Sequence, residues 1–543
     1  MLQQIELVVG LLVAVAGLAW LARKIQIPYP ILLVLGGLLL ALILEMIPGL
    51  PRIHLNPDLV FLIFLPPLLY PAALYTSWRD FHANLRPISL LAIGLVLVTT
   101  CSVGLVAHSL IPGLPWAAGF VLGAIISPPD AVAAAAITER LHVPRRVVTI
   151  IEGESLVNDA TALVAYRFAV AALLTGSFSL AGAGLQFLAV SVGGIAIGLA
   201  TGWLASHAQR RLDDPPVQIT ISILTPFVAY LASEQFHVSG VLAVVTAGLY
   251  LGWRSPEIIN SRMRLQSGPV WEMIVFILNG FVFILIGLQL PEVLEGLPKK
   301  SGSVSRFTGY AILISMLVIV VRFVWVIAAT YLPRWLSRKL RERDPLPPWQ
   351  NILIVAWTGM RGVVSLAAAL ALPFTMRNEA AFPYRDLIIY CTFVVILVTL
   401  VLQGLTLPLL IRWLKVVDSG ESEEEERDAR LKANQAALAR LAEMEEHDDY
   451  PAELLQRLRV EYDDRVRQLE ICEQTDNDGA RHLFSADYEH LQQEALNVER
   501  QTILQLRNER VINDEVLRRI QRDLDLAEAR LPKEHSRPKT NNA

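Results

Sequence analysis

The stretch AIISPPDAVAAAAI, residues 124–137, lies within a long apolar segment and cannot form one continuous helix. Pro128 and Pro129 lack the backbone N–H groups that a helix needs, and their rings clash with the preceding turn. We therefore predict that a first half-helix ends before Asp130 and that a second, alanine-rich half begins just after it.

A second apolar stretch, WTGMRGVVSLAAALALP at residues 357–373, carries a similar interruption. Gly359 and Gly362 flank Arg361 there, and an alanine-rich half again follows. The two interruptions look like counterparts in one architecture. Proline and glycine can also merely kink a membrane helix, so the interpretation depends on the charges nearby.

The composition is that of an integral membrane protein. The 543 residues are 54% hydrophobic and have a mean hydropathy of +0.46, which is too apolar for a soluble chain of this length. Cys101, Cys391 and Cys472 lie far apart, and the ten histidines form no cluster with metal-ligand spacing. Neither a disulfide framework nor a zinc site is indicated, and we expect no cofactor and no nucleic-acid partner.

Thirteen apolar segments are long enough to be membrane helices. A helix needs about 20 apolar residues to cross a bilayer core of about 30 Å, because its backbone groups must be hydrogen-bonded within the helix. The expected segments are 5–22, 30–47, 58–75, 87–111, 115–139, 146–175, 180–207, 217–235, 238–253, 268–290, 307–332, 349–372 and 386–413. We therefore predict an all-α polytopic membrane protein with interruptions in its fifth and twelfth segments.

The loop charges predict the orientation of these segments. An odd number of crossings places the two termini on opposite sides of the membrane. With the N-terminus outside, 19 Lys and Arg residues lie at cytoplasmic helix ends and 6 lie outside, which agrees with the positive-inside rule. We expect a multi-pass protein of the cell inner membrane with a cytoplasmic C-terminal tail.

The positions of the two interruptions predict an inverted repeat. They lie seven segments apart, and because seven is odd, equivalent helices cross the membrane in opposite directions. Segments one to six and eight to thirteen would be the two halves, joined by the seventh. Broken helices in matching positions of inverted halves mark the midplane site of a transporter, because half-helix ends offer carbonyls and partial charges to an ion.

Charged residues gather near the predicted breaks. They are Asp130, Glu154, Asp159, Arg322 and Arg361. A charge at the middle of the bilayer costs about 2.5–3.5 kcal/mol on insertion scales, so it is retained mainly where it meets a partner, a cavity or an ion. These residues therefore favour a functional break over a simple kink.

The stretch GESLVNDA in the sixth segment gives one helix two polar edges. Ser155 and Asp159 are four residues apart and share a face, whereas Glu154 and Asn158 share the neighbouring face. With Asp130 at the first break, Ser155, Asn158 and Asp159 form an all-oxygen group suited to Na⁺ or Li⁺. Because burial disfavours a charged carboxylate, Asp159 can hold either a proton or a cation, as an exchanger requires.

The remaining membrane charges have two interpretations. Glu154 and Arg322 are expected to pair, since an unpaired buried charge is costly. A structural brace is favoured for this pair over a direct role in transport. Arg361, between its two glycines, is expected to neutralise the C-terminal ends of the half-helices.

At this point the chain resembles the sodium/proton exchanger family of monovalent cation/proton antiporters, most closely its bacterial branch. The motifs that carry the resemblance are SPPDAV, GESLVNDA, NGFVFILIGLQLP, VVRFVW and GMRGVVSLAAAL, spread over about 410 residues. The resemblance implies a homodimer with a dimer domain of segments one to three and eight to ten. A core of segments four to six and eleven to thirteen would move against it.

The resemblance also implies roles for single residues. Asp159 would bind the cation or the proton, with Ser155 and Asp130 in or beside the coordination shell of Na⁺ and Asn158 orienting the site. Two departures from the family pattern bear on ion affinity. Pro129 stands where a hydroxyl residue is usual, and Pro71 stands where many relatives have an acidic residue.

The charge changes abruptly after the last membrane segment. Up to Lys415 there are 28 Lys and Arg against 20 Asp and Glu, whereas the remainder has 19 against 31. We expect a transmembrane domain at 1–415 and an acidic helical cytoplasmic tail at 416–543. Apolar residues recur at helical spacing in the tail at Leu454, Leu458, Tyr462 and Val466 and at Leu517, Ile520, Leu524, Ala527 and Leu531. These patterns predict short helices, either in a solvated hairpin or paired across a dimer, and a disordered end at 533–543.

The sequence therefore predicts a secondary antiporter that exchanges Na⁺, with Li⁺ or K⁺ as alternatives, for protons across the cell membrane. Because Asn158 next to Asp159 is neutral, one-for-one electroneutral exchange is expected. A K⁺/H⁺ antiporter or a cation channel of the same architecture is the alternative. An intramembrane enzyme is disfavoured, since no protease motif is present.

Overall fold

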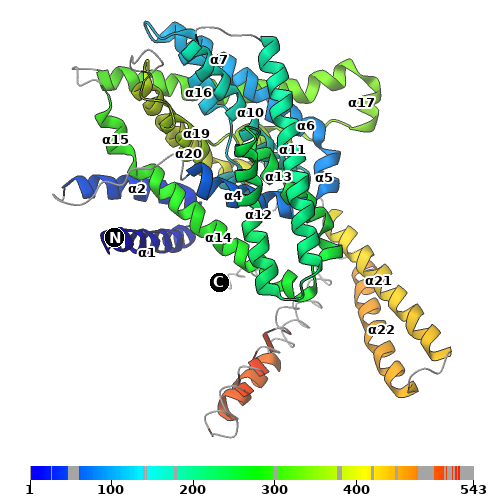
Figure 1. Ribbon diagram of the computed structural model, residues 1–543. Coiled ribbons are helices and arrows are strands. Elements are labelled where there is room, and N and C mark those ends of the chain that lie inside the picture. Colours follow the sequence, from blue (N-terminus) through cyan, green and yellow to red (C-terminus); the bar gives the residue numbers. More distant parts are fainter. Residues whose placement is uncertain are drawn as a thin grey trace, which may run out of the picture. The chain divides into compact units, whose positions relative to one another are not determined.

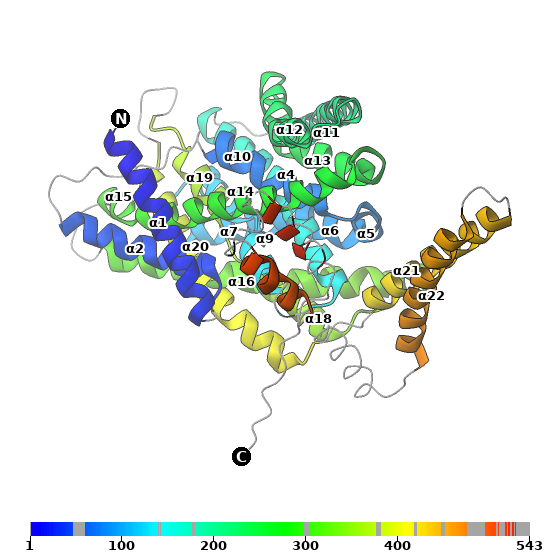
Figure 2. The same ribbon diagram turned by 90° about the horizontal axis from the view of Figure 1, so that it is seen from below.

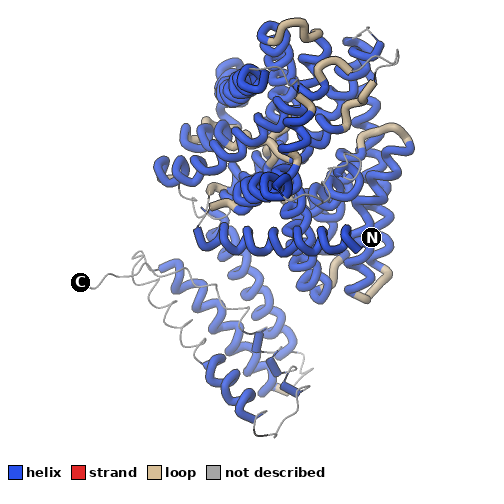
Figure 3. The backbone as a smooth tube through the Cα atoms, turned by 90° about the vertical axis from the view of Figure 1, so that its left-hand side faces the viewer, coloured by secondary structure: helices blue, strands red, loops and turns tan. Residues whose placement is uncertain are grey.

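The chain folds into helices arranged in two compact units, residues 1–418 and residues 419–543 (Figure 1). The computed structural model describes residues 2–25, 27–46, 60–138, 141, 143–175, 180–297, 303–375, 382–416, 421–446, 451–474, 495–506, 509, 516, 517, 520, 521, 524, 525 and 527. Helices account for almost all of the backbone drawn in Figure 3.

The first half of the larger unit contains eleven helical elements in its described residues. They are α1 (Leu2–Ile25), α2 (Tyr29–Met46), the π-helical turn η1 (Val60–Phe64), α4 (Leu65–Tyr75), α5 (Trp78–Ala83), α6 (Leu85–Ser89), the π-helical turn η2 (Leu90–Leu95), α7 (Val96–Leu110), α8 (Trp116–Ile126), α9 (Ala131–Thr138) and α10 (Arg145–Thr175). The predicted segments 58–75 and 87–111 are thus not uniform α-helices, since each contains a π-helical turn.

The second half follows the same pattern of long helices and one interrupted helix. Its elements are α11 (Leu180–Arg210), α12 (Pro215–Gln235), α13 (Gly240–Ile258), α14 (Ser261–Leu288), α15 (Leu290–Glu295), α16 (Ser303–Leu336), α17 (Arg338–Arg343), α18 (Trp349–Trp357), α19 (Val363–Leu370) and α20 (Arg385–Leu414).

The prediction of an all-α polytopic membrane protein is confirmed. Within the described residues, eight helices are long and apolar enough to cross a membrane, and shorter apolar helices lie at 29–44, 60–75 and 116–126. All thirteen predicted segments fall on helices or on interrupted pairs of helices. The number of thirteen crossings and their orientation stay predictions.

Both predicted interruptions are present as gaps between short helices. α8 ends at Ile126 and α9 begins at Ala131, so the two prolines lie between them. α18 ends at Trp357 and α19 begins at Val363. α8 contacts α19, and α10 packs against α8, α9 and α18, so both breaks lie beside the helix that carries the GESLVNDA motif.

Small residues allow the remaining helices to approach closely, as is usual between membrane helices. A Cβ atom added to Gly37 of α2 would lie 2.3 Å from the carbonyl oxygen of Ile284 in α14, and one added to Gly287 would lie 2.3 Å from that of Val34. α1, α2 and α14 group on one side of the unit, and α11, α12 and α13 lie together elsewhere in it (Figures 1 and 2).

The smaller unit contains a helical hairpin of α21 (Glu421–Glu446) and α22 (Ala452–Gln474). The short helix predicted from Leu454, Leu458, Tyr462 and Val466 is confirmed as α22. Within it Leu455 is buried, whereas Leu454 and Leu458 are exposed. Further along, Ile503 packs with Leu517 and Leu524, two residues of the second apolar pattern. The end at 533–543 lies outside the described residues.

Because the chain forms two compact units, we predict that deleting residues 419–543 leaves the larger unit folded. The truncated protein should insert at the normal level and unfold at the same temperature. The cation/proton exchange expected from the sequence should persist, with a shifted dependence on pH or cation concentration. A control truncated after Gln474 retains the hairpin. Loss of all flux from an inserted and folded truncation would show that the tail belongs to the transport machinery.

Candidate functional site

The two interrupted helices satisfy each other's backbone groups where they meet. The backbone N–H of Asp130, just before α9, donates to the carbonyl of Met360 between α18 and α19, with an N–O distance of 2.7 Å. The Arg361 guanidinium donates through Nη1 to the carbonyl of Ser127, just after α8. The N–H of Arg361 donates to Thr399 Oγ1 of α20 at 3.1 Å. In a continuous helix these backbone groups would be paired within the helix, whereas here they join the two breaks to each other.

Asp130 immediately precedes α9 and also faces the other break. Its Oδ1 accepts a hydrogen bond from the N–H of Val132 at 2.8 Å, which satisfies one of the free N–H groups at a helix start. A Cβ atom added to Gly362 would lie 1.7 Å from Asp130 Oδ2. Gly362 is thus required because the Asp130 carboxylate occupies the space where any larger residue would place its side chain.

Asn158 in the middle of α10 holds that helix to the first break. Its Nδ2 donates to the carbonyl of Pro129 at 3.0 Å, and the Asn158 side chain is fully buried. Pro129 has no side-chain hydroxyl, so only its backbone carbonyl could serve an ion, and that carbonyl already accepts the Asn158 hydrogen bond. The Oδ1 of Asn158 is buried without a partner among the described residues.

Asp159 is the carboxylate at this site that has no fixed partner. Its side chain is 6% exposed, and it makes no hydrogen bond or ion pair with any described residue. It lies close enough to Asp130 for the two charges to act on each other. Ser155, one helical turn earlier on the same face, is half-buried. A carboxylate in this environment gains from binding either a proton or a cation.

Glu154 and Arg322 form a buried ion pair between α10 and α16. The Arg322 guanidinium donates from Nη1 to Glu154 Oε1 at 2.6 Å and from Nη2 to Oε2 at 2.8 Å, and both side chains are 1% exposed. Arg322 also donates from Nε and Nη2 to the carbonyl of Val355 in α18. A Cβ atom at Gly359 would lie 2.5 Å from Arg322 Cδ, so this glycine makes room for the arginine.

The two breaks meet at the hydrogen bonds between Asp130 and Met360 and between Arg361 and Ser127, and this meeting point is called the crossing below. Several groups at the crossing were not predicted from the sequence. Met360 and Ser127 contribute backbone carbonyls, which carry no signal in the sequence. Thr399 and Gln403 are four residues apart in α20, and this i, i+4 spacing of polar residues on an apolar helix was a usable signal. Gln403 is 1% exposed, and neither end of its amide has a partner in the described part of the chain.

The chemistry available is that of two carboxylates and neutral oxygens. No group of three or more His, Cys, Asp or Glu side chains in the described ranges could hold a metal ion as a resident cofactor. Oxygen ligands of this kind suit small hard cations. The fold, with two broken helices crossing beside a buried aspartate, defines a membrane transporter of small cations.

Comparisons with known proteins agree with this class. The family of transmembrane sodium/hydrogen exchangers matches residues 10–413. A Na⁺/H⁺ exchanger of Mycobacterium tuberculosis is 36% identical over 535 residues, covering 96% of this chain and 95% of the relative. A sodium, potassium, lithium and rubidium/H⁺ antiporter of Bacillus subtilis is 37% identical over 392 residues, covering 71% of this chain and 58% of the relative.

A solved structure has the same fold. The sodium proton antiporter MjNhaP1 from Methanocaldococcus jannaschii superposes with a TM-score of 0.60 and 20% identity, covering 75% of this chain and 97% of that structure. The chain belongs to the sodium/hydrogen exchanger family. It is therefore a monovalent cation/proton antiporter and not an enzyme.

We predict that Glu154→Gln or Arg322→Leu alone lowers the free energy of unfolding by about 3–5 kcal/mol, because each leaves a buried charge unpaired. The double variant should recover part of this loss. Thermal unfolding of the purified variants measures both effects. Arg167→Gln is the matched control, because the Arg167–Glu234 pair is 54% and 41% exposed and such pairs contribute about 0–1 kcal/mol. Simple addition of the two single losses in the double variant would mean that the residues are not coupled.

Proposed function

We propose that the chain exchanges Na⁺ for protons across the cell membrane and that Asp159 carries each of them in turn. The observation that supports this most strongly is the environment of Asp159. It is buried beside the crossing of two broken helices, it lies near Asp130, and no described residue fixes its charge. The other charged side chains of the site each have a hydrogen-bonded partner among the described residues: Asp130, Glu154, Arg322 and Arg361.

In the proposed cation-bound state, Na⁺ is held by Asp159, Asp130 and the hydroxyl of Ser155. Asp130 uses Oδ1 for the N–H of Val132 and retains lone pairs for an ion. Asn158 orients the site through its hydrogen bond to Pro129. When a proton replaces the cation, the Asp159 carboxylate becomes neutral and the site loses one of its negative charges. The proton and the cation therefore compete for Asp159.

Transport then requires that the site open to each side of the membrane in turn. The site residues come from α8 to α10, α16 and α18 to α20, which correspond to the fifth, sixth and eleventh to thirteenth segments. The fourth segment contributes α7, which packs against α8 and α16. We propose that these helices form a core that moves as one body. The first to third and eighth to tenth segments would form a dimer domain, and the protein would be a homodimer with its N-terminus outside and a role in pH homeostasis.

A different substrate, K⁺, and a different mechanism, a cation channel, can each be separated from Na⁺/H⁺ exchange by transport measurements. K⁺ is a candidate substrate, since the Bacillus subtilis relative is named for sodium, potassium, lithium and rubidium. Proteoliposomes with an imposed pH gradient, tested with Na⁺, Li⁺ and K⁺ in turn, separate these substrates. A cation channel would conduct without saturation and without the pH gradient, whereas exchange at one buried carboxylate saturates.

We predict that Asp159→Asn abolishes cation-dependent proton flux in proteoliposomes while the protein remains folded. The substitution preserves the size of the side chain and removes the charge that alternates between proton and cation. Glu234→Gln is the control, because this carboxylate is exposed and lies away from the crossing. Asp130→Asn should also impair flux severely. Cation-dependent flux in a folded Asp159→Asn protein would exclude Asp159 as the carrier.

We predict that exchange is electroneutral, one Na⁺ for one proton. Only Asp159 changes its charge state, since Asn158 is neutral and Glu154 is fixed by Arg322. The loaded core then has the same net charge in both directions. Moving one net charge through the membrane is worth about 2.3 kcal/mol per 100 mV, so voltage is a sharp probe. In vesicles clamped with K⁺ and valinomycin, Na⁺-driven proton flux should not respond to voltage, and a clear acceleration would contradict a single exchanging carboxylate.

A further inference from the structure

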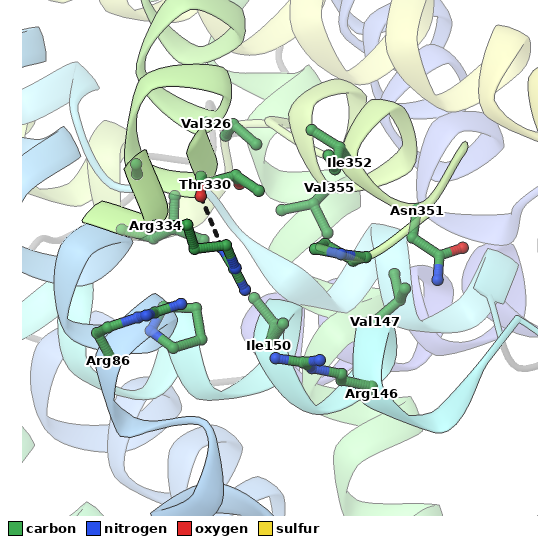
Figure 4. A pocket seen from close by; sticks show the side chains of 14 residues that line it. Arg86, Arg146, Val147, Ile150, Val326, Thr330, Arg334, Asn351, Ile352 and Val355 are labelled. Carbon is green, nitrogen blue, oxygen red and sulfur yellow. Dashed lines mark hydrogen bonds between the residues drawn. The ribbon is translucent and has the colours of Figure 1, made fainter. Parts of the chain in front are cut away.

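Away from the crossing, three arginines line one pocket between helices that also carry the cation site. The pocket has a volume of about 70 Å³ and lies between α6, α10, α16 and α18. Arg86, Arg146 and Arg334 contribute its charges, and Asn351 lies at its edge (Figure 4). Its other walls are mainly apolar, with Val147, Ile150, Val326, Ile352 and Val355 among them. These arginines all lie at predicted cytoplasmic helix ends.

One carboxylate joins the three arginines. Asp344, after α17, accepts hydrogen bonds from Arg86 at 2.7 Å and from Arg334 at 2.9 Å through Oδ2, and from Arg146 at 2.8 Å through Oδ1. Burial alone would raise the pKa of Asp344, but the Arg146 hydrogen bond and the charges of the three arginines together hold it below its usual value. With Asp344 charged, the cluster carries three positive charges and one negative charge.

The arginines retain donors that Asp344 does not use. Arg86 Nε and Nη1 are buried and have no hydrogen-bond partner among the described residues. A buried guanidinium donor without an acceptor is costly, and Arg86 lines the pocket directly (Figure 4). The pocket therefore combines unsatisfied donors with a net positive charge of two, and both features favour an anion with several acceptor oxygens.

We propose that this pocket binds a phosphate group, either of a lipid headgroup or free in the cytoplasm. Arginine forms paired hydrogen bonds with phosphate oxygens and is favoured where such recognition is needed. The volume of about 70 Å³ is several times the roughly 10–15 Å³ that one water requires, so it admits a group larger than a single water. A bound phosphate would accept hydrogen bonds from Arg86 and balance the positive charge of the arginines that Asp344 does not neutralise.

The bound phosphate would tie four helices together at one end of the proposed core. α10 carries Asn158 and Asp159, and α16 carries Arg322, so the pocket and the cation site share two helices. Binding can be measured on the purified full-length protein without any transport assay. A failure of the transport proposal would therefore leave this one standing, and the reverse also holds.

The test measures thermal unfolding of the full chain in detergent, with inorganic phosphate or chloride at equal ionic strength. A second arm adds phosphatidylglycerol or phosphatidylcholine. Stabilisation by inorganic phosphate would identify the free anion, and stabilisation by phosphatidylglycerol alone would identify the lipid headgroup. Arg86→Gln should weaken the apparent affinity at least about tenfold, as expected for a lost hydrogen bond to a charged group.

Three further variants exclude a general effect of charge or folding. Arg338→Gln is the matched control, because Arg338 is 83% exposed and lies outside the pocket, and it should bind as the original protein does. Ala329→Phe fills the pocket, retains every charge and should abolish the stabilisation. The Asp344→Asn variant should bind phosphate more tightly than the original protein. It should be less stable without phosphate and should recover that stability when phosphate is added. Stabilisation that is absent in the original protein, or equal in Arg86→Gln and Arg338→Gln, would overturn the proposal.

Discussion

The structure depends on one constraint, which is that two membrane helices are broken and their free backbone groups lie away from water. Hydrocarbon offers no hydrogen bonds, so these groups must pair within the protein. They pair across the crossing, from Asp130 to Met360 and from Arg361 to Ser127. Each break thus supplies hydrogen-bond partners to the other. In the predicted inverted repeat, the parent helices of the two breaks would run in opposite directions.

The same constraint divides the nearby polar residues into fixed and free groups. Asn158 is held by Pro129, and Glu154 is held by Arg322, which is in turn held by Val355. These contacts join α10, α16 and α18 through buried hydrogen bonds, which are costly to break singly. In the proposed transport cycle, a movement that opens the site to one side would therefore carry these helices together. This favours a moving core over a local gate at the crossing.

The sequence allowed the breaks, the buried ion pair and the helix that carries Asp159 to be predicted, because prolines and membrane charges have few alternative explanations. It did not reveal the partners at the crossing, since the carbonyls of Met360 and Ser127 belong to residues whose side chains are not involved. The burial of Leu455 in α22 was not predicted, for a different reason. In a mostly polar helix the apolar residues are few, so their spacing predicts a helix but not which of them packs against a neighbour.

The charges of the helix ends explain why one carboxylate remains available. A half-helix has a partial negative charge at its C-terminus and a partial positive charge at its N-terminus. Arg361 lies at the C-terminal end of α8, and Asp130 lies at the start of α9 and against Gly362 at the start of α19. Each of these two side chains thus lies at a helix end of opposite partial charge, and their own unit charges cancel. In the proposed mechanism, the negative charge of Asp159 is therefore left for a substrate ion to neutralise.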